Sequence, residues 1–363
     1  MEVDARVEAW ASLQLLPQVP ARSLVALLKA LGGPEEVLRS SRSALGAHVP
    51  ASVAARIAHG PEPAALAFTL EWLRGSGNAL IAWDDAHYPQ ALLTITDPPP
   101  VLFYRGDPEL LNRPALAIVG SRNATAQGRE TAEAFATALS AAGLTIVSGL
   151  ALGIDAAAHR GGLAAAGRSL AVVGTGIDRV YPARNRDLAH RLAEQGGIVS
   201  EFSLGTPPLP GNFPRRNRLI SGLARGVLVI EATLASGSLI TARFAAEQGR
   251  DVFAIPGSIH SPFSKGSHRL IKDGAKLVES AQDVLEEWHL AGLPSATPAA
   301  FAGAALEGNA ARVLSALGHD PGGVDALVQR CGLAADAVSI ALVELELAGE
   351  VESLPGGLYQ RLD

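Results

Sequence analysis

The stretch "ALAIVGSRNATAQGRETAEAFATALSAAGLTIVSG", residues 115–149, sets the fold class. Both of its ends, 115–120 and 144–149, are short apolar runs that close on a glycine. The residues between them have the periodicity of one amphipathic helix. Uninterrupted apolar strands joined by a helix are typical of a parallel sheet covered on both faces, with right-handed crossovers.

The same pattern recurs further along the chain. A second amphipathic helix is expected over 238–249, and further buried strands are expected at 169–174, 197–202, 226–232 and 251–257. This alternation predicts an α/β fold with a Rossmann-like, doubly wound, mostly parallel sheet. The segment 78–107 is expected to add strands to one edge of that sheet.

The flanking regions have different patterns. Near the N-terminus, leucines at 24, 27, 28 and 31 form one helical face, which Gly32 and Gly33 end before Pro34 starts another helix. The C-terminal part predicts three helices followed by a β-hairpin that turns at "PGG", as in a winged helix. We therefore expect a small helical domain of the SAM or helix-hairpin-helix kind at 1–72, an extended Rossmann-like domain at 73–290, an Ala/Gly/Pro-rich linker at 291–307 and a winged-helix domain at 308–363.

Composition limits the class of protein. The chain has 363 residues, with 48% hydrophobic and 18% charged residues, which argues against disorder. No apolar run has the length that a bilayer span needs, and the first ten residues lack the pattern of a signal peptide. The single cysteine, Cys331, excludes an internal disulfide. We expect a cytoplasmic protein that does not associate with membranes.

Charge is segregated along the chain. The formal net charge is -6, yet residues 211–276 hold ten Lys or Arg against four Asp or Glu, and "GNFPRRNR" at 211–218 supplies three of these arginines. Positive potential concentrated in an otherwise acidic protein favours one defined anionic ligand over nonspecific coating of polyanions. We expect these arginines to emerge from a loop.

Glycines, hydroxyl residues and cations gather where the predicted strands end. Gly120, Ser121 and Arg122 follow one strand, residues 236–238 follow another, and Lys265, Gly266 and Ser267 open a helix after a third. Each turn alone is compatible with a tight turn or a helix cap. Together they lie on one rim of a parallel sheet, and their backbone N–H groups suit phosphates. A row of phosphate sites predicts a polynucleotide ligand.

Other chemistry is disfavoured. Gly174 and Gly176 begin a dinucleotide-like pattern, but Arg179 stands at the third glycine and the strand is the third, so we reject NAD binding. Asp155 and His159, at i and i+4, are more consistent with a structural pair than with a catalytic dyad. We expect no catalytic residue, metal or cofactor, and we expect Glu201 and Glu231 to stabilise loop amides or arginines.

The predicted recognition helix of the winged-helix region is acidic. Residues 334–348 contain Asp336, Glu344 and Glu346 and no Lys or Arg. Phosphate repulsion would oppose its insertion into a major groove. This region is expected to contact protein instead of duplex DNA.

Six ordered motifs resemble one family. They are "SGLALGIDAAAH", "GTGIDRVYP", "SEFSLGTPP", "NFPRRNRLISGL", "SGSLITA" and "KGSHRLIKDGA", and the chain is similar to the DNA-processing protein A (DprA, or Smf) family over the whole Rossmann-like region. The resemblance implies a cytoplasmic, non-enzymatic homodimer that binds single-stranded DNA in natural transformation and loads the recombinase RecA onto it.

The resemblance also implies the DNA-binding residues. The family's Gly-Ser-Arg pocket falls on 120–122, its Phe-Pro-x-Arg-Asn-Arg motif on 213–218, and its Ser-Gly-Ser segment on 236–238. His268 stands where the family usually has asparagine. The expected DNA-binding set is Gly120, Ser121, Arg122, Arg184, Asn185, Arg215, Arg216, Asn217, Arg218, Ser236, Gly237, Ser238, Thr241, Lys265, Gly266 and Ser267.

Two alternatives stay open from the sequence. One is a nucleotide-processing hydrolase of the lysine-decarboxylase-like Rossmann type, although its Pro-Gly-Gly-x-Gly-Thr segment is not found here. The other is a transcription factor that binds duplex DNA through the winged helix.

Overall fold

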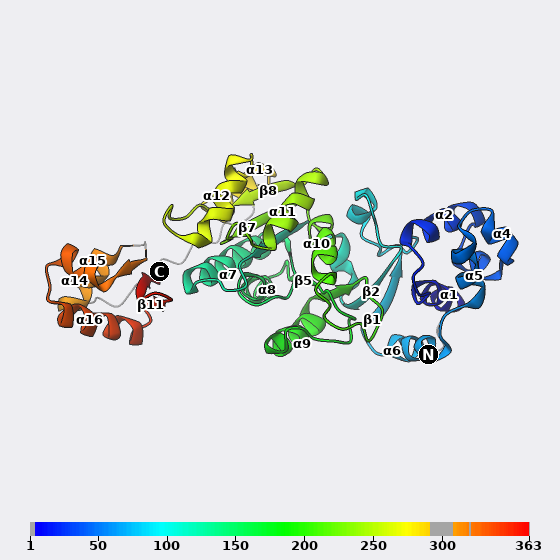
Figure 1. Ribbon diagram of the computed structural model, residues 1–363, viewed down its shortest axis with the longest axis horizontal. Helices are drawn as coiled ribbons and strands as arrows, with labels where there is room; N and C mark the ends of the chain where they lie inside the picture. The colour runs from blue at the N-terminus through cyan, green and yellow to red at the C-terminus, as the bar shows by residue number, and fades with distance from the viewer. Residues whose placement is uncertain (1–3, 291–307, 319–320, 363) are drawn as a thin grey trace.

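A computed structural model of the chain describes residues 4–290, 308–318 and 321–362. Figure 1 shows three parts in a row, with N-terminal helices at one end, a central sheet, and a small C-terminal unit at the other end. The expected linker, 291–307, lies outside the described residues.

The central sheet has nine strands in the order β1-β2-β6-β5-β4-β3-β7-β8-β9. The seven strands from β6 to β9 in this order are parallel, and β1 and β2 add an antiparallel edge beside β6. All six predicted strands are present. The strands are β1 (Asn78–Ala82), β2 (Val101–Gly106), β3 (Ala115–Gly120), β4 (Thr145–Ser148), β5 (Ser169–Val172), β6 (Gly197–Ser200), β7 (Gly226–Ile230), β8 (Asp251–Ala254) and β9 (Lys276–Leu277).

Alternate residues of each strand pack against helices on opposite faces. Leu116 and Ile118 of β3 join the core under α7, α8 and α13, whereas Ala117 and Val119 join the core under α10 and α11. The helices of this part are α7 (Ala126–Ala141), α8 (Ile154–Leu163), α9 (Arg186–Gln195), α10 (Asn212–Leu223), α11 (Ser238–Glu247), α12 (Lys265–Lys272) and α13 (Ala281–Glu287), with short 3-10 turns η1 (Gln90–Thr94), η2 (Pro108–Asn112), η3 (Ala183–Asn185) and η4 (Pro262–Ser264).

The strand order reverses beside β3. The chain runs from β3 through α7 to β4 on one side and returns through α10 to β7 on the other. In an open α/β sheet, such a reversal leaves a crevice at the carboxyl ends of the strands, where ligands bind. A ligand site is therefore expected at the carboxyl ends of β3 and β7, which form the centre of this rim of the sheet.

The N-terminal part is helical, and its leucine face is buried as predicted. Leu24, Leu27 and Leu28 are buried, and the first of the paired glycines, Gly32, ends their helix at a φ of 107°. These helices share a hydrophobic cluster with β1, β2 and α9. The helices are α1 (Ala5–Gln14), α2 (Ala21–Leu31), α3 (Pro34–Arg39), α4 (Arg42–Gly46), α5 (Ala51–His59) and α6 (Pro63–Leu73).

The C-terminal part has its own core and the winged-helix order of elements. The predicted hairpin turns at residues 355–357. A short third strand, β10, pairs with β12 and was not predicted, because a Gly-Gly pair carries no strand signal. The elements are α14 (Gly308–Leu317), β10 (Gly322–Gly323), α15 (Val324–Cys331), α16 (Ala335–Leu347), β11 (Val351–Leu354) and β12 (Leu358–Arg361).

Within the described ranges, no single helix is both long and apolar enough to cross a membrane, although the bent pair α15–α16 would qualify on length and composition alone.

Candidate nucleic-acid interface

Gly120 allows β3 and β7 to meet closely at the reversal point. A Cβ at this position would lie 1.9 Å from the backbone oxygen of Ile230. The neighbouring Ser121 N–H donates to the carbonyl of Glu231 at 2.7 Å. The Gly-Ser-Arg turn thus brings Arg122 onto the rim while Gly120 and Ser121 are held against β7.

Backbone N–H groups at the start of α7 are already satisfied within the chain. Glu231 accepts from the Thr125 backbone N–H at 2.9 Å and from its hydroxyl at 2.5 Å. Burial raises the pKa of Glu231, and the bonds from Thr125 oppose that rise. Glu352, on β11, accepts from the Ala126 N–H at 2.6 Å at the start of α7. The expected open anion site at this helix N-terminus is therefore filled by the chain's own carboxylates.

Arg122 remains exposed and lies over an aromatic ring. Its guanidinium carbon is 5.8 Å from the ring centroid of Phe213, at the start of α10. The Phe213 ring is in turn 5.5 Å from the ring of Tyr181, which is 49% exposed. Arg184, also exposed, follows three residues after Tyr181. The rim thus has a cationic and aromatic surface, here called the Arg122–Tyr181 platform and made of Arg122, Phe213 and Tyr181.

The three arginines at 215, 216 and 218 lie on helix α10, so the prediction that they emerge from a loop is wrong. Pro214 fits within the first turn of α10, because the first N–H groups of a helix need no intrahelical acceptor. At about 100° per residue, Arg215 and Arg218 point to one side of α10, and Arg216 points to the other. The three side chains consequently have different environments.

Arg216 is buried beneath the rim. Its guanidinium donates to the backbone oxygen of Gly149 at 2.7 Å and to that of Val172, and it is only 4% exposed. Burial lowers the pKa of Arg216 to about 10, nearby Asp155 opposes that change, and Arg122 adds to it. In this conformation the guanidinium binds backbone carbonyls at the ends of β4 and β5 and is not open to a phosphate.

Four side chains satisfy the backbone of the turn at Gly149–Ala151. Asp155 accepts from the N–H groups of Gly149 and Ala151, at 3.1 and 3.3 Å. His159 accepts from the Leu150 N–H at 3.3 Å, and Asn185 donates to the carbonyls of Leu150 and Ala151 at 2.9 and 3.1 Å. With Arg216 on the Gly149 carbonyl, these bonds hold Leu150 at a φ of 58°.

This arrangement confirms the structural interpretation of Asp155 and His159. The other nitrogen of His159 is 2.7 Å from the hydroxyl of Ser169, and burial, with a smaller effect of Arg216, lowers the pKa of His159 to about 3. Burial raises the pKa of Asp155, and Arg216 opposes that rise. Both groups are buried, and Asn185, also buried, likewise supports the turn.

A pH-dependent stability follows from His159. Because the pKa of His159 in the folded protein, about 3, lies below its ordinary value of 6.5, the unfolded chain takes up the proton first, and the free energy of unfolding falls as the pH drops below 6.5. We expect a loss of about 2 kcal/mol between about pH 7 and about pH 5 from this group. Urea unfolding at both pH values measures it. His159→Gln should lack this part of the pH dependence, and identical pH profiles for the two proteins would contradict the assignment.

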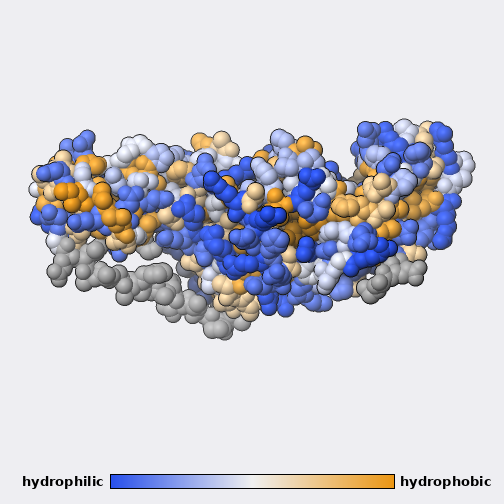
Figure 2. All heavy atoms as spheres, turned by 90° about the horizontal axis from the view of Figure 1, so that it is seen from below, coloured by the Kyte–Doolittle hydropathy of each residue, from blue (hydrophilic) through white to orange (hydrophobic). Residues whose placement is uncertain are grey.

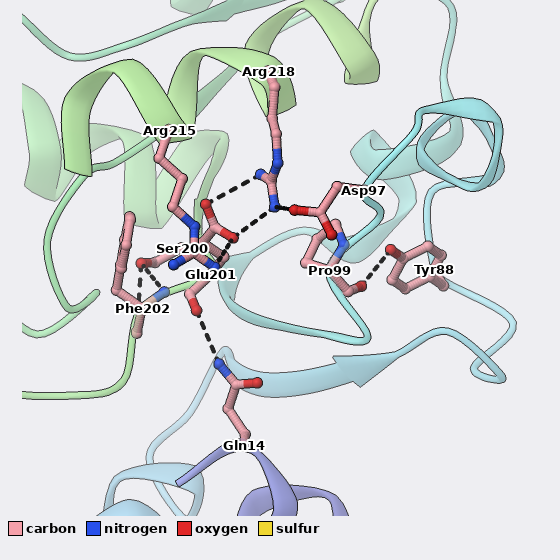
Figure 3. Close-up of polar contacts among 9 residues, drawn as sticks. All are labelled: Gln14, Tyr88, Asp97, Pro99, Ser200, Glu201, Phe202, Arg215 and Arg218. Atoms are coloured by element: carbon pink, nitrogen blue, oxygen red, sulfur yellow. Dashed lines mark hydrogen bonds and ion pairs between the residues drawn. The ribbon is translucent and has the colours of Figure 1, made fainter. Parts of the chain in front are cut away.

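Glu201 holds the other two arginines (Figure 3). Arg218 makes two bonds with its carboxylate, at 3.1 and 2.8 Å, and Arg215 makes one at 3.1 Å. Asp97 lies 3.5 Å from Arg218. Gln14 of α1 donates to the Glu201 backbone oxygen at 2.9 Å, so this cluster also contacts the N-terminal helices. The expected pairing of Glu201 with arginines is confirmed.

The two arginines differ in exposure. Arg218 is 10% exposed in its side chain, whereas Arg215 is 56% exposed and lies 5.5 Å from the Phe202 ring centroid. The buried guanidinium of Arg218 is therefore committed to Glu201, whereas the guanidinium of Arg215 also faces solvent.

The loop after β7 lies beside the start of α10. The side chain of Asn217 donates to the Gly237 carbonyl at 3.5 Å, and the Ser236 and Ser238 hydroxyls are 2.7 Å apart. Helix α11 begins at Ser238 with Gly237 as its N-cap and no side-chain cap, so neither serine caps it. Thr241 is buried. Of the expected residues in this loop, Gly237 is exposed, as are the neighbouring Leu234 and Ala235.

The segment before α12 packs on the end of β7. The Gly266 N–H donates to the Ala232 carbonyl at 2.6 Å, and Ser267 is buried. Lys265 is exposed and donates to the Ile259 carbonyl. His268 contacts the Gly257 carbonyl at 2.9 Å and so ties down this loop. Of the expected residues here, only Lys265 faces solvent.

The described part of the chain brings no three His, Cys, Asp or Glu side chains together in a way that could hold a metal ion.

Sequence reasoning did not single out Tyr181, which the structure places in the platform beside Phe213. It occurs in the motif "GTGIDRVYP", but an isolated tyrosine gives no signal of what it will stack on. Its approach to Phe213 arises from the packing of α10 against the loop after β5, where a Cβ on Gly174 would lie 2.9 Å from the Phe213 ring.

The fold and the rim define a doubly wound α/β protein with a cationic and aromatic surface at the carboxyl ends of its strands and a winged helix after it. Residues 79–289 match the family of DNA recombination-mediator protein A, and residues 297–357 match the DprA winged helix domain. The chain belongs to the DprA (Smf) family, whose members are DNA-processing and recombination-mediator proteins.

Several relatives support this membership. Protein Smf of Escherichia coli is 46% identical over 300 residues, which cover 81% of this chain and 80% of the relative. A putative DNA processing protein DprA of Mycobacterium tuberculosis is 34% identical over 370 residues, with 98% of this chain and 94% of the relative covered.

Two solved structures are similar. DNA processing protein A from Streptococcus pneumoniae has a TM-score of 0.68 and 39% identity, over 79% of this chain and 99% of that one. DNA processing protein A from Helicobacter pylori has a TM-score of 0.53 and 30% identity, over 58% and 95%, and its structure concerns the single-stranded DNA binding mode of that protein.

Proposed function

We propose that this chain binds single-stranded DNA along the rim, with the Arg122–Tyr181 platform as its centre. The proposal rests mainly on one observation: the exposed guanidinium of Arg122 lies over the Phe213 ring, beside the half-exposed Tyr181. A cation can neutralise a phosphate while the aromatic faces stack on bases, and this combination is how sequence-tolerant single-strand binders work. The H. pylori relative supports the choice of a single strand.

The exposed groups of the expected set are the ones assigned to direct contact. They are Arg122, Arg184, Arg215, Gly237 and Lys265. The buried members shape the rim instead: Asn185 and Arg216 hold the Gly149–Ala151 turn, and Arg218 is bound to Glu201. Phosphate contacts carry no base information, so binding should tolerate any sequence.

We extend the proposal to the cellular role that family membership suggests. In it, the chain acts in the cytoplasm as a non-enzymatic homodimer, protects incoming DNA during natural transformation and loads RecA onto it. The burial of Asp155 and His159 and their hydrogen bonds to the Gly149–Ala151 turn support a binding role for the rim.

The test compares Arg122→Ala with Tyr181→Ala. Arg122→Ala should weaken single-strand binding by about 1 to 2 kcal/mol for every sequence and reduce the slope of log K against log salt by about 0.7, because one phosphate contact is lost. Tyr181→Ala should weaken binding by about 1 to 3 kcal/mol per stacked base and leave the slope unchanged. Anisotropy titrations of a labelled oligonucleotide at several salt concentrations measure both quantities.

Arg42→Ala is the matched control, because Arg42 is an exposed arginine on α4 in the N-terminal part. It should leave affinity and salt slope unchanged. Equal losses for Arg42→Ala and Arg122→Ala would contradict a localised site. Tighter binding of duplex than of single strands would favour the winged-helix alternative, and release of base from nucleoside monophosphates would favour the hydrolase.

A further inference from the structure

Helix α16 carries an apolar stripe on the side away from its own core. Val338, Ala341, Leu342 and Leu345 are buried against the rest of the winged-helix part. On the opposite side, Ile340 is 61% exposed, Val343 is 52% exposed and Leu347 is 84% exposed. Single exposed apolar residues are ordinary, but a contiguous set indicates an interaction surface.

The spacing of the exposed residues has the geometry of a docking helix. Ile340, Val343 and Leu347 stand at i, i+3 and i+7, which places them on one line along α16. This is the spacing of the anchors with which one helix packs against another. Figure 2 shows apolar surface gathered at the end of the molecule that the winged-helix part forms.

Acidic residues surround the stripe. At about 100° per residue, Glu344 flanks one side of it, Glu346 flanks the other, and Asp336 lies in line at its N-terminal end. All three are exposed, and α16 contains no Lys or Arg. An apolar seam with like charges on both sides selects a partner helix with the opposite charge, as the flanking positions of coiled coils do.

The charge pattern disfavours other occupants. A second copy of α16 would bring glutamates against glutamates, and nucleic acid or an anionic membrane would be repelled by the same carboxylates. We propose that the stripe formed by Ile340, Val343 and Leu347 docks an amphipathic helix of a partner protein whose apolar face is flanked by lysines or arginines. This surface shares no residue with the proposed DNA interface, so the two proposals stand separately.

A synthetic peptide pair tests the proposal with the full chain. One helical peptide carries leucines at i, i+3, i+4 and i+7 flanked by lysines, and its counterpart has glutamates at every lysine position. Fluorescence anisotropy of the labelled peptides should show binding of the basic peptide about tenfold tighter than of the acidic one, a difference of about 1.4 kcal/mol. High salt should weaken the basic complex.

Two variants identify the surface. Leu347→Asp should weaken the basic peptide about tenfold or more, because it removes an apolar anchor. The double variant Glu344→Lys, Glu346→Lys should reverse the preference in favour of the acidic peptide. Asp325→Lys, which changes an exposed charge on α15, is the control and should bind like the wild type. Circular dichroism of each variant verifies that the winged-helix part is folded.

Several outcomes would overturn the proposal. They are equal affinity for both peptides, no binding of either, or an unchanged preference after the double charge reversal. Self-association of the chain that Leu347→Asp abolishes would assign the stripe to a second copy instead. Binding to phosphatidylcholine vesicles with the same dependence on Leu347 would assign it to a lipid surface.

Discussion

Replacing Arg216 with alanine is expected to lower the free energy of unfolding by about 3 to 5 kcal/mol, because it leaves the buried Asp155 carboxylate without the cation that opposes its desolvation. Urea denaturation followed by circular dichroism measures the change. The effect is large because the Arg216 guanidinium serves both the Asp155 carboxylate and two backbone carbonyls. The guanidinium and the carboxylate pack closely on Gly149, since both lie 2.7 Å from the position that a Cβ on this glycine would occupy.

Without Arg216, Asp155 would lose its nearest cation, and the carbonyls of Gly149 and Val172 would lose their donor. An unsatisfied buried polar group costs about 1 to 3 kcal/mol. Single-strand binding should weaken as well, because the segment that follows the Gly149–Ala151 turn is bonded to the Gly-Ser-Arg turn: the Ile154 N–H donates to the Ser121 carbonyl at 3.1 Å.

Arg122→Ala separates the two roles of arginine on the rim. We expect it to leave stability within about 0.5 kcal/mol of the wild type, because Arg122 is exposed. If Arg216→Ala kept full stability and lost only DNA affinity, Arg216 would be a direct phosphate ligand, and its assignment to the supporting layer would be wrong.

Replacing Glu201 with alanine should also lower the free energy of unfolding by about 3 to 5 kcal/mol, because it leaves the Arg218 guanidinium buried without its bidentate partner. The Arg218 Nε already has no hydrogen-bond partner. Thermal and urea unfolding measure the loss. Glu201, Arg215 and Arg218 line a cavity of about 230 Å³ against α1 and α2, so the N-terminal helices should lose protection from proteolysis too.

Asp97→Ala is the matched control, since Asp97 reaches the same guanidinium at 3.5 Å but its side chain is 57% exposed. An exposed partner of this kind contributes about 0 to 1 kcal/mol. Equal destabilisation by the two substitutions would show that solvent screens Glu201 as much as Asp97. The double variant Glu201→Leu, Arg218→Met should recover most of the loss, because desolvation of both charges is then avoided.

The strands and their neighbours could be predicted because buried parallel strands leave a direct pattern. Runs such as "ALAIVG" and "GVLVIEA" have few alternatives, and their order along the chain implies crossovers. The pairing of Glu201 with arginines followed from charge alone. β10 was missed, since its two glycines pair through backbone groups and have no side-chain pattern.

The environments of the arginines could not be predicted. "FPRRNR" shows three cations, but the direction of each depends on the start of α10 at Asn212, which the proline obscured. Arg215 and Arg216 are adjacent in the sequence, yet the first guanidinium is solvated and the second is buried. Exposure, which decides whether a cation can meet a phosphate, is a property of tertiary packing and not of the motif.

Helix α10 is fastened on both sides at once. Arg216 ties one side to the ends of β4 and β5, and Arg218 ties the other to Glu201, whose backbone is bonded to Gln14 of the N-terminal helices. The helix therefore connects the rim to the N-terminal helices through hydrogen bonds on both of its sides. Because a rotation of α10 about its axis would break both attachments, we expect its orientation between the rim and the N-terminal helices to be fixed.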